Sequence, residues 1–73
     1  MEYAMLIEVE GEGGFSASFP DLPGCFTQGD TLGKLMVNAE DAVATYLSAL
    51  RELGKPIPEA KHRVASVVIA EEK

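Results

Sequence analysis

The sequence predicts an α+β fold with the element order β-β-β-α-β, in which one long helix covers one face of an antiparallel-rich sheet. Three observations predict it. Residues 2–9 and 15–19 alternate apolar and other side chains, a pattern typical of two strands of a hairpin. Residues 31–53 carry apolar side chains at three- and four-residue steps, as an amphipathic helix does. Residues 63–70 are nearly all apolar and rich in β-branched side chains, as in a buried strand.

A turn-forming segment joins the first two predicted strands. In residues 2–9, one side of the alternation carries Tyr3, Met5, Ile7 and Val9. Residues 10–14 (EGEGG) are turn-forming, and residues 15–19 resume the alternation with Phe15, Ala17 and Phe19 on one face. We therefore expect a β-hairpin over residues 2–19.

A proline-rich loop separates the hairpin from the third strand. Residues 20–24 (PDLPG) cannot continue a sheet, because prolines lack the donor N–H and glycine interrupts the pattern. Residues 25–28 (CFTQ) are predicted to be a short third strand. Asp30 is the expected N-cap of the helix, because a carboxylate accepts hydrogen bonds from the first free amides.

The helix is expected to run from Thr31 to Leu53, with Gly54 just beyond its end and Pro56 preventing its resumption. The final strand is expected from Arg63 to Ala70. One helix can cover only one face of a sheet. We expect the chain to be a single domain over residues 1–73. The uncovered apolar face, which includes Ala4, Leu6, Val67 and Ile69, is expected to form a homodimer or larger oligomer.

Composition and charge limit the classes of function. The 73 residues include twelve acidic and six basic side chains, giving a net charge of −6 and a pI near 4.5. This charge repels nucleic-acid phosphates and favours a basic partner, although it also serves simple solubility. No apolar run approaches the roughly 20 residues of a membrane span, and no basic start suggests a signal peptide. With Cys25 as the one cysteine, no internal disulfide is expected, and a reducing cytoplasm is the default compartment.

Four motifs follow one another along the chain: Gly13-Gly14-Phe15, Ser18-Phe19-Pro20-Asp21-Leu22-Pro23-Gly24-Cys25, Gln28-Gly29-Asp30-Thr31-Leu32 and Gly54-Lys55-Pro56-Ile57-Pro58. In this order and spacing they resemble the motifs of HicB-like antitoxins, and the similarity spans nearly the whole chain. The resemblance implies a partial ribonuclease H-like fold, a sheet with one long helix, which agrees with the order predicted from the residues.

The resemblance also implies a function. Such a protein would neutralise a small, basic, messenger-RNA-cleaving toxin of the HicA type by covering its active surface. Gly33 and Lys34 depart from the family, which usually has glutamates at these positions. Many members continue into a DNA-binding domain, whereas this chain ends at Lys73, so we expect a truncated form without direct DNA binding. A stand-alone homo-oligomer with another binding role is the first alternative, and a residual nuclease is the second.

Nuclease chemistry on a ribonuclease H-like fold needs several carboxylates that converge on paired magnesium ions. The first carboxylate should project from the middle of the first strand, where residues 4–7 (AMLI) have none. Three acidic residues lie toward or beyond the end of this strand: Glu8, Glu10 and Glu12. We therefore expect no enzymatic activity, no metal site and no cofactor.

Two further features have a functional and a structural interpretation. Cys25 and His62 could form a thiol nucleophile with its base, but a small apolar residue and a polar residue before a strand are the stronger interpretation. The loop Pro20, Asp21, Leu22, Pro23, Gly24 and Cys25 either turns the chain between two strands or serves as a rigid partner-binding edge. Tyr46 is expected to pack on the sheet with its hydroxyl at the rim.

Overall fold

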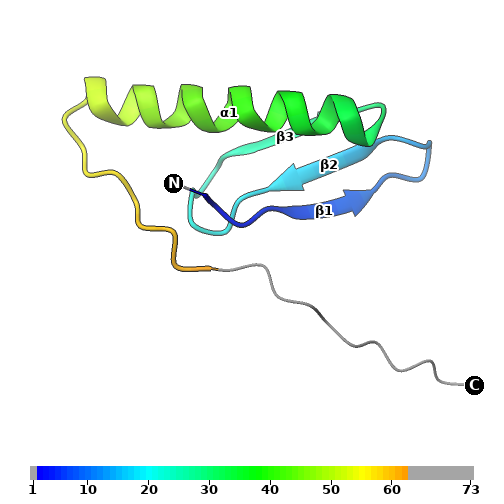
Figure 1. The fold of residues 1–73 in the computed structure, drawn as a ribbon, viewed down its shortest axis with the longest axis horizontal. Helices are drawn as coiled ribbons and strands as arrows, with labels where there is room; N and C mark the ends of the chain where they lie inside the picture. The colour runs from blue at the N-terminus through cyan, green and yellow to red at the C-terminus, as the bar shows by residue number, and fades with distance from the viewer. Residues whose placement is uncertain (1, 63–73) are drawn as a thin grey trace, which may run out of the picture.

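The computed structural model describes residues 2–62, which form three strands followed by one helix. The elements are β1 (Leu6–Val9), β2 (Phe15–Ser18), β3 (Phe26–Gly29) and α1 (Leu32–Glu52). The strands form an antiparallel sheet in the order β1-β2-β3, and α1 lies along one side of it (Figure 1). The predicted β-β-β-α order is confirmed. The fourth strand, Arg63–Ala70, lies outside the described residues, so it stays a prediction, as do the single domain and the ribonuclease H-like likeness.

The strand register decides which side chains face the helix. Ile7 lies opposite Ala17, and Ala17 lies opposite Thr27, so these three share one face. Ala17 is only 4% exposed, which places this face against α1. The neighbouring row, Leu6, Ser18 and Phe26, therefore points to the other side. We call that side the outer face and define it by the residues Leu6, Glu8, Ser16, Ser18, Phe26 and Gln28.

The core lies between the helix and the end of the sheet where β2 leads into β3. Its buried members are Phe19, Leu22, Cys25 and Ala39. Partly buried side chains pack around them: Tyr3, Met5, Ala42, Val43, Tyr46 and Leu47. Three of the four buried members of this cluster lie in the loop between β2 and β3, and the fourth lies in α1.

The helix begins at Leu32, one residue later than expected, and its N-cap is shifted by the same amount. Thr31, not Asp30, is the N-cap: its backbone is extended (φ −130°, ψ 163°), and its hydroxyl accepts a hydrogen bond from the Lys34 N–H at 3.1 Å. The expectation for Asp30 was wrong because the Thr31 hydroxyl, at the next position, caps the helix by accepting from the Lys34 N–H. The helix ends at the predicted place, with Gly54 in the left-handed region at φ 71°.

The helix is longer than the sheet that it covers. Its 21 residues extend about 32 Å, whereas strands of four residues extend about 13 Å. On the apolar face of the helix, Leu35 and Ala39 are buried, whereas Leu32, Met36 and Leu53 are half exposed or more in the described part of the chain. The short strands reach only part of this face.

The chain returns to the sheet after the helix. Figure 1 shows the segment beyond α1 turning back past the N-terminal end of β1. The Tyr3 hydroxyl donates a hydrogen bond of 2.6 Å to the Pro58 carbonyl. This bond fastens the returning segment beside residues that precede β1.

Candidate partner-binding surface

The loop from Pro20 to Cys25 is built around inward-pointing side chains. Leu22 is fully buried and Cys25 is 6% exposed. Two tight turns hold them, because the Leu22 N–H donates to the Phe19 carbonyl and the Cys25 N–H to the Leu22 carbonyl, each at 3.0 Å. Gly24 has a φ of 82°, a conformation that L side chains rarely adopt. These contacts explain the loop by its structural role, and partner binding through its exposed Pro23 and Gly24 stays a prediction.

Asp21 joins this loop to the segment after the helix. Its Oδ2 accepts a hydrogen bond of 2.9 Å from the His62 backbone N–H, and its Oδ1 lies 2.6 Å from His62 Nδ1. The hydrogen bond from the His62 backbone N–H is the largest influence and lowers the pKa of Asp21; burial opposes it, and the hydrogen bond to the His62 side chain lowers the pKa further. The Asp21 side chain is 6% exposed. The Asp21 carboxylate is therefore hydrogen-bonded within the chain, and its contact with a partner stays a prediction.

The two candidate catalytic groups are in different environments. Cys25 is buried, and burial raises the pKa of its thiol, which favours the neutral and unreactive form. His62 directs its Nδ1 to Asp21 instead. Within residues 2–62 no three side chains of His, Cys, Asp or Glu gather in a way that would hold a metal ion. The expected lack of enzymatic activity stays a prediction.

Two helix side chains donate hydrogen bonds to backbone carbonyls, one in β3 and one in the loop before it. The Tyr46 hydroxyl donates to the Pro23 carbonyl, and the Asn38 amide donates to the Gln28 carbonyl, each at 2.8 Å. The first bond places the hydroxyl of Tyr46 at the rim of the core, as the sequence predicts. The second blocks part of the free edge of β3, since the Gln28 carbonyl cannot then pair with another strand.

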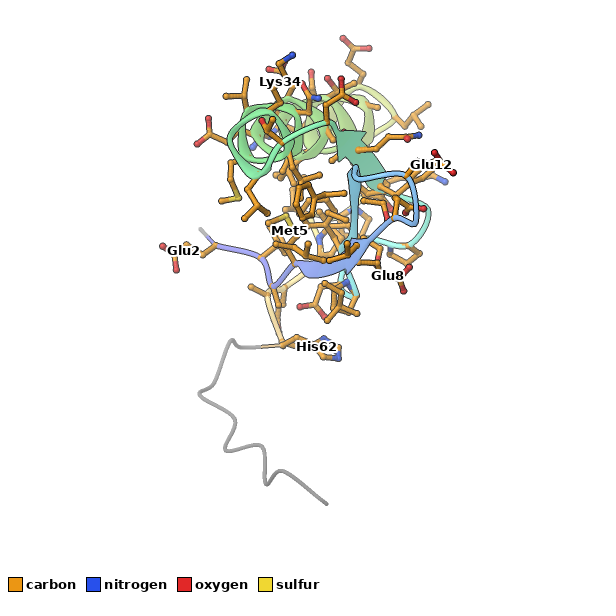
Figure 2. The ribbon with its side chains drawn as sticks, turned by 90° about the vertical axis from the view of Figure 1, so that its right-hand side faces the viewer. Glu2, Met5, Glu8, Glu12, Lys34 and His62 are labelled. Atoms are coloured by element: carbon orange, nitrogen blue, oxygen red, sulfur yellow. The ribbon has the colours of Figure 1, made fainter. Side chains whose placement is uncertain are left out.

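The outer face leaves apolar side chains open to solvent. Leu6 is 58% exposed and Phe26 is 64% exposed. They lie on either side of Ser18 in one row across the sheet. In Figure 2, Glu8 lies by β1 on the side away from α1 and Glu12 lies at the turn between β1 and β2, whereas Met5 points toward the helix. This face therefore combines apolar and acidic groups.

Sequence reasoning identified this face only in part. Leu6 is exposed as expected of an interface residue, whereas Ala4 is 9% exposed and already buried within the chain. Val67 and Ile69 lie outside the described residues, so the oligomer interface stays a prediction. Phe26 was missed, because its direction depends on the pairing of β3 with β2. The signal available in the sequence was the aromatic side chain of Phe26 next to the apolar Cys25 in a short predicted strand.

Comparison with known proteins identifies the family. Residues 3–72 match the family model for the HicB-like antitoxin of bacterial toxin–antitoxin systems. The chain belongs to the HicB-like antitoxin family. The resemblance seen in its four motifs is thereby confirmed.

Relatives of this HicB-like chain include short and long proteins. A UPF0150 protein of Thermoplasma acidophilum is 34% identical over 58 residues, covering 80% of this chain and 84% of its own length. Antitoxin HicB 1 of Photorhabdus laumondii is 40% identical over 58 residues, again 80% of this chain but 37% of its own length. Antitoxin HicB of Escherichia coli K12 is 36% identical, with 80% and 42% covered. The chain thus spans about two fifths of these two antitoxins.

The helix is long enough to be compared with a membrane span. Its 21 residues include charged side chains at five positions: Lys34, Glu40, Asp41, Arg51 and Glu52. No helix in the described part of this HicB-like chain has the length and apolar character needed to cross a bilayer.

Proposed function

We propose that this HicB-like chain is a non-enzymatic, cytoplasmic binding protein that neutralises a small, basic, messenger-RNA-cleaving toxin of the HicA type by covering its active surface. The observation that carries the proposal is the family match over residues 3–72. Two of the relatives are named antitoxins, and each aligns with four fifths of this chain.

The charge of the chain supports the same partner. A net charge of −6 attracts a basic protein over distances of about one Debye length, near 10 Å at 0.1 M salt. Such attraction raises the rate of encounter more than it strengthens the final complex. It also repels the RNA that the toxin acts on, so an acidic inhibitor and the substrate compete for one basic surface without binding each other.

The partner toxin is expected to be encoded beside this chain, so co-purification with the neighbouring gene product tests the proposal. The two proteins are expressed together with an affinity tag on the partner, and the complex is washed at physiological salt. We expect this chain to remain bound in a fixed ratio. If the neighbouring product is basic and folded but does not retain this chain at micromolar concentration, the antitoxin proposal is wrong.

The second candidate is a homo-oligomeric binding protein without a toxin partner. The exposed Leu6 and Phe26 favour it, because an apolar row on an open sheet face can be covered by a second copy. Sedimentation at micromolar concentration distinguishes the states. A dimer or larger species supports self-association, and a species of 7.8 kDa excludes it.

A further inference from the structure

The net charge of the chain lies entirely in its first half. Residues 1–33, which form the sheet and its loops, contain six acidic side chains and no lysine or arginine. The acidic residues are Glu2, Glu8, Glu10, Glu12, Asp21 and Asp30. Residues 34–73 contain six acidic and six basic side chains and are neutral overall. The attraction for a basic partner is therefore centred on the sheet and not on the helix.

Among residues 2–62, the outer face is the side of the sheet that no described element covers. Its opposite side is covered by α1, where Ala17 is 4% exposed. Leu6 and Phe26 form the apolar centre of the outer face, separated by the small Ser18. Glu8 lies on the same face, because it pairs with Ser16 in the row next to Leu6, and Figure 2 shows it by β1 on the side away from α1.

Two other surfaces fit a basic partner less well. The free edge of β3 is partly blocked, because Asn38 holds the Gln28 carbonyl. A groove between α1 and residues 2–5, which precede β1, is lined by Met5 and Met36 and by the carboxylates of Glu2 and Glu40. The helix that forms one side of it also carries Lys34 and Arg51, whereas the three strands carry no lysine or arginine, so the groove attracts a basic protein less strongly than the sheet does.

We propose that the outer face is the docking surface for a basic protein partner. Leu6 and Phe26 act as the apolar anchors, and Glu8, with Glu12 in the neighbouring turn between β1 and β2, receives lysine or arginine side chains that surround an apolar patch on the partner. This inference rests on the proposed function, whose partner surface it assigns. It follows the usual anatomy of interfaces, in which a few large apolar residues at the centre contribute most of the affinity and a polar rim surrounds them.

A second copy of the chain fits this face less well. Two copies docked through their outer faces would bring two sets of carboxylates together, and like charges across an interface oppose association. A basic partner neutralises the same carboxylates. The charge distribution therefore favours the partner over the second copy as the occupant of this face.

Four variants test the assignment, with the purified product of the neighbouring gene as the probe. The outer-face pair is Phe26→Ser and Glu8→Lys. The matched pair in the groove is Met36→Ser and Glu40→Lys, which makes the same kinds of change at exposed sites on the helix. Calorimetry measures the dissociation constant, stopped-flow mixing measures the association rate, and thermal unfolding confirms that each variant is folded.

Phe26→Ser is expected to weaken binding tenfold or more, as loss of a central anchor typically does. Glu8→Lys is expected to slow association about tenfold at low salt, with a smaller effect as salt rises. The groove variants should stay within about twofold of the unmodified chain, as rim and peripheral changes do.

Several results would overturn the assignment. Loss of binding in the groove variants with unchanged outer-face variants would move the partner to the groove and leave the proposed function intact. If Phe26→Ser dissociates a homodimer without weakening partner binding, the outer face binds a second copy of the chain. If it lowers only the melting temperature, the chain's own residues cover the face. A lack of binding by the unmodified chain would reject both the assignment and the proposed function.

Discussion

Gly29 is the position where the helix approaches the sheet most closely. A Cβ added at Gly29 would lie 2.6 Å from the Leu35 backbone N and 2.9 Å from its Cα. These atoms belong to the helix backbone and cannot rotate away as a flexible side chain could. Gly29→Ala therefore has to shift α1 relative to β3, which we expect to cost about 1–3 kcal/mol, as forced overpacking usually does.

Gly33→Ala is the matched control, because it adds the same methyl group four residues later. Its Cβ would meet nothing nearer than the Thr31 hydroxyl oxygen at 3.9 Å. Alanine favours the helix over glycine by roughly 0.5–1 kcal/mol, so this variant should be more stable than the unmodified chain. The two substitutions should thus have opposite signs.

Thermal unfolding followed by circular dichroism measures both variants. Since 1 kcal/mol corresponds to about 4–8 °C in a domain of this size, Gly29→Ala should lower Tm by 4 °C or more. Gly33→Ala should raise Tm by a few degrees. Equal effects of the two substitutions, or a stabilising Gly29→Ala, would refute the close packing of α1 on the end of β3.

Two further substitutions test the loop between β2 and β3. Leu22→Ala removes a fully buried side chain and should lower the free energy of unfolding in urea by about 2–5 kcal/mol. Leu53→Ala is the control: its side chain is 68% exposed, so the free energy of unfolding should change by less than about 0.5 kcal/mol. Similar costs for the two variants would contradict the placement of Leu22 in the core. Asp21 has a lowered pKa in the folded chain, so its contribution to stability is present above its ordinary pKa and is lost as the pH falls through the lowered value. Asp21→Asn should therefore be less stable than the unmodified chain at pH 7 and should lose less stability on acidification; parallel pH profiles would contradict the pairing with His62.

Local patterns in the sequence predicted the elements well. The three- and four-residue apolar spacing gave α1 to within one residue at each end, because helix periodicity is set by neighbouring residues. The cap was wrong by one position. Asp30 and Thr31 are both capping types, and only the backbone conformation decides which of them holds the Lys34 N–H.

Long-range pairing was beyond the reach of these patterns. The bond between Asp21 and His62 joins residues 41 positions apart, and no spacing rule connects them. The exposure of Phe26 depends on the pairing of Ser18 with Phe26, which fixes the face of each residue in β3. The candidate surface therefore needed the register of the sheet, whereas its acidic character was already present in the sequence.

The central claim is that this HicB-like chain suppresses a basic, messenger-RNA-cleaving partner by binding it. The most direct measurement is a titration of the neighbouring gene product with this chain, in which cleavage of a messenger RNA is followed at low and at physiological salt. We expect cleavage to fall to zero at a fixed molar ratio, with slower onset of inhibition at the higher salt, because the association rate depends on charge attraction. Cleavage that continues unchanged in the presence of excess folded chain would contradict the claim.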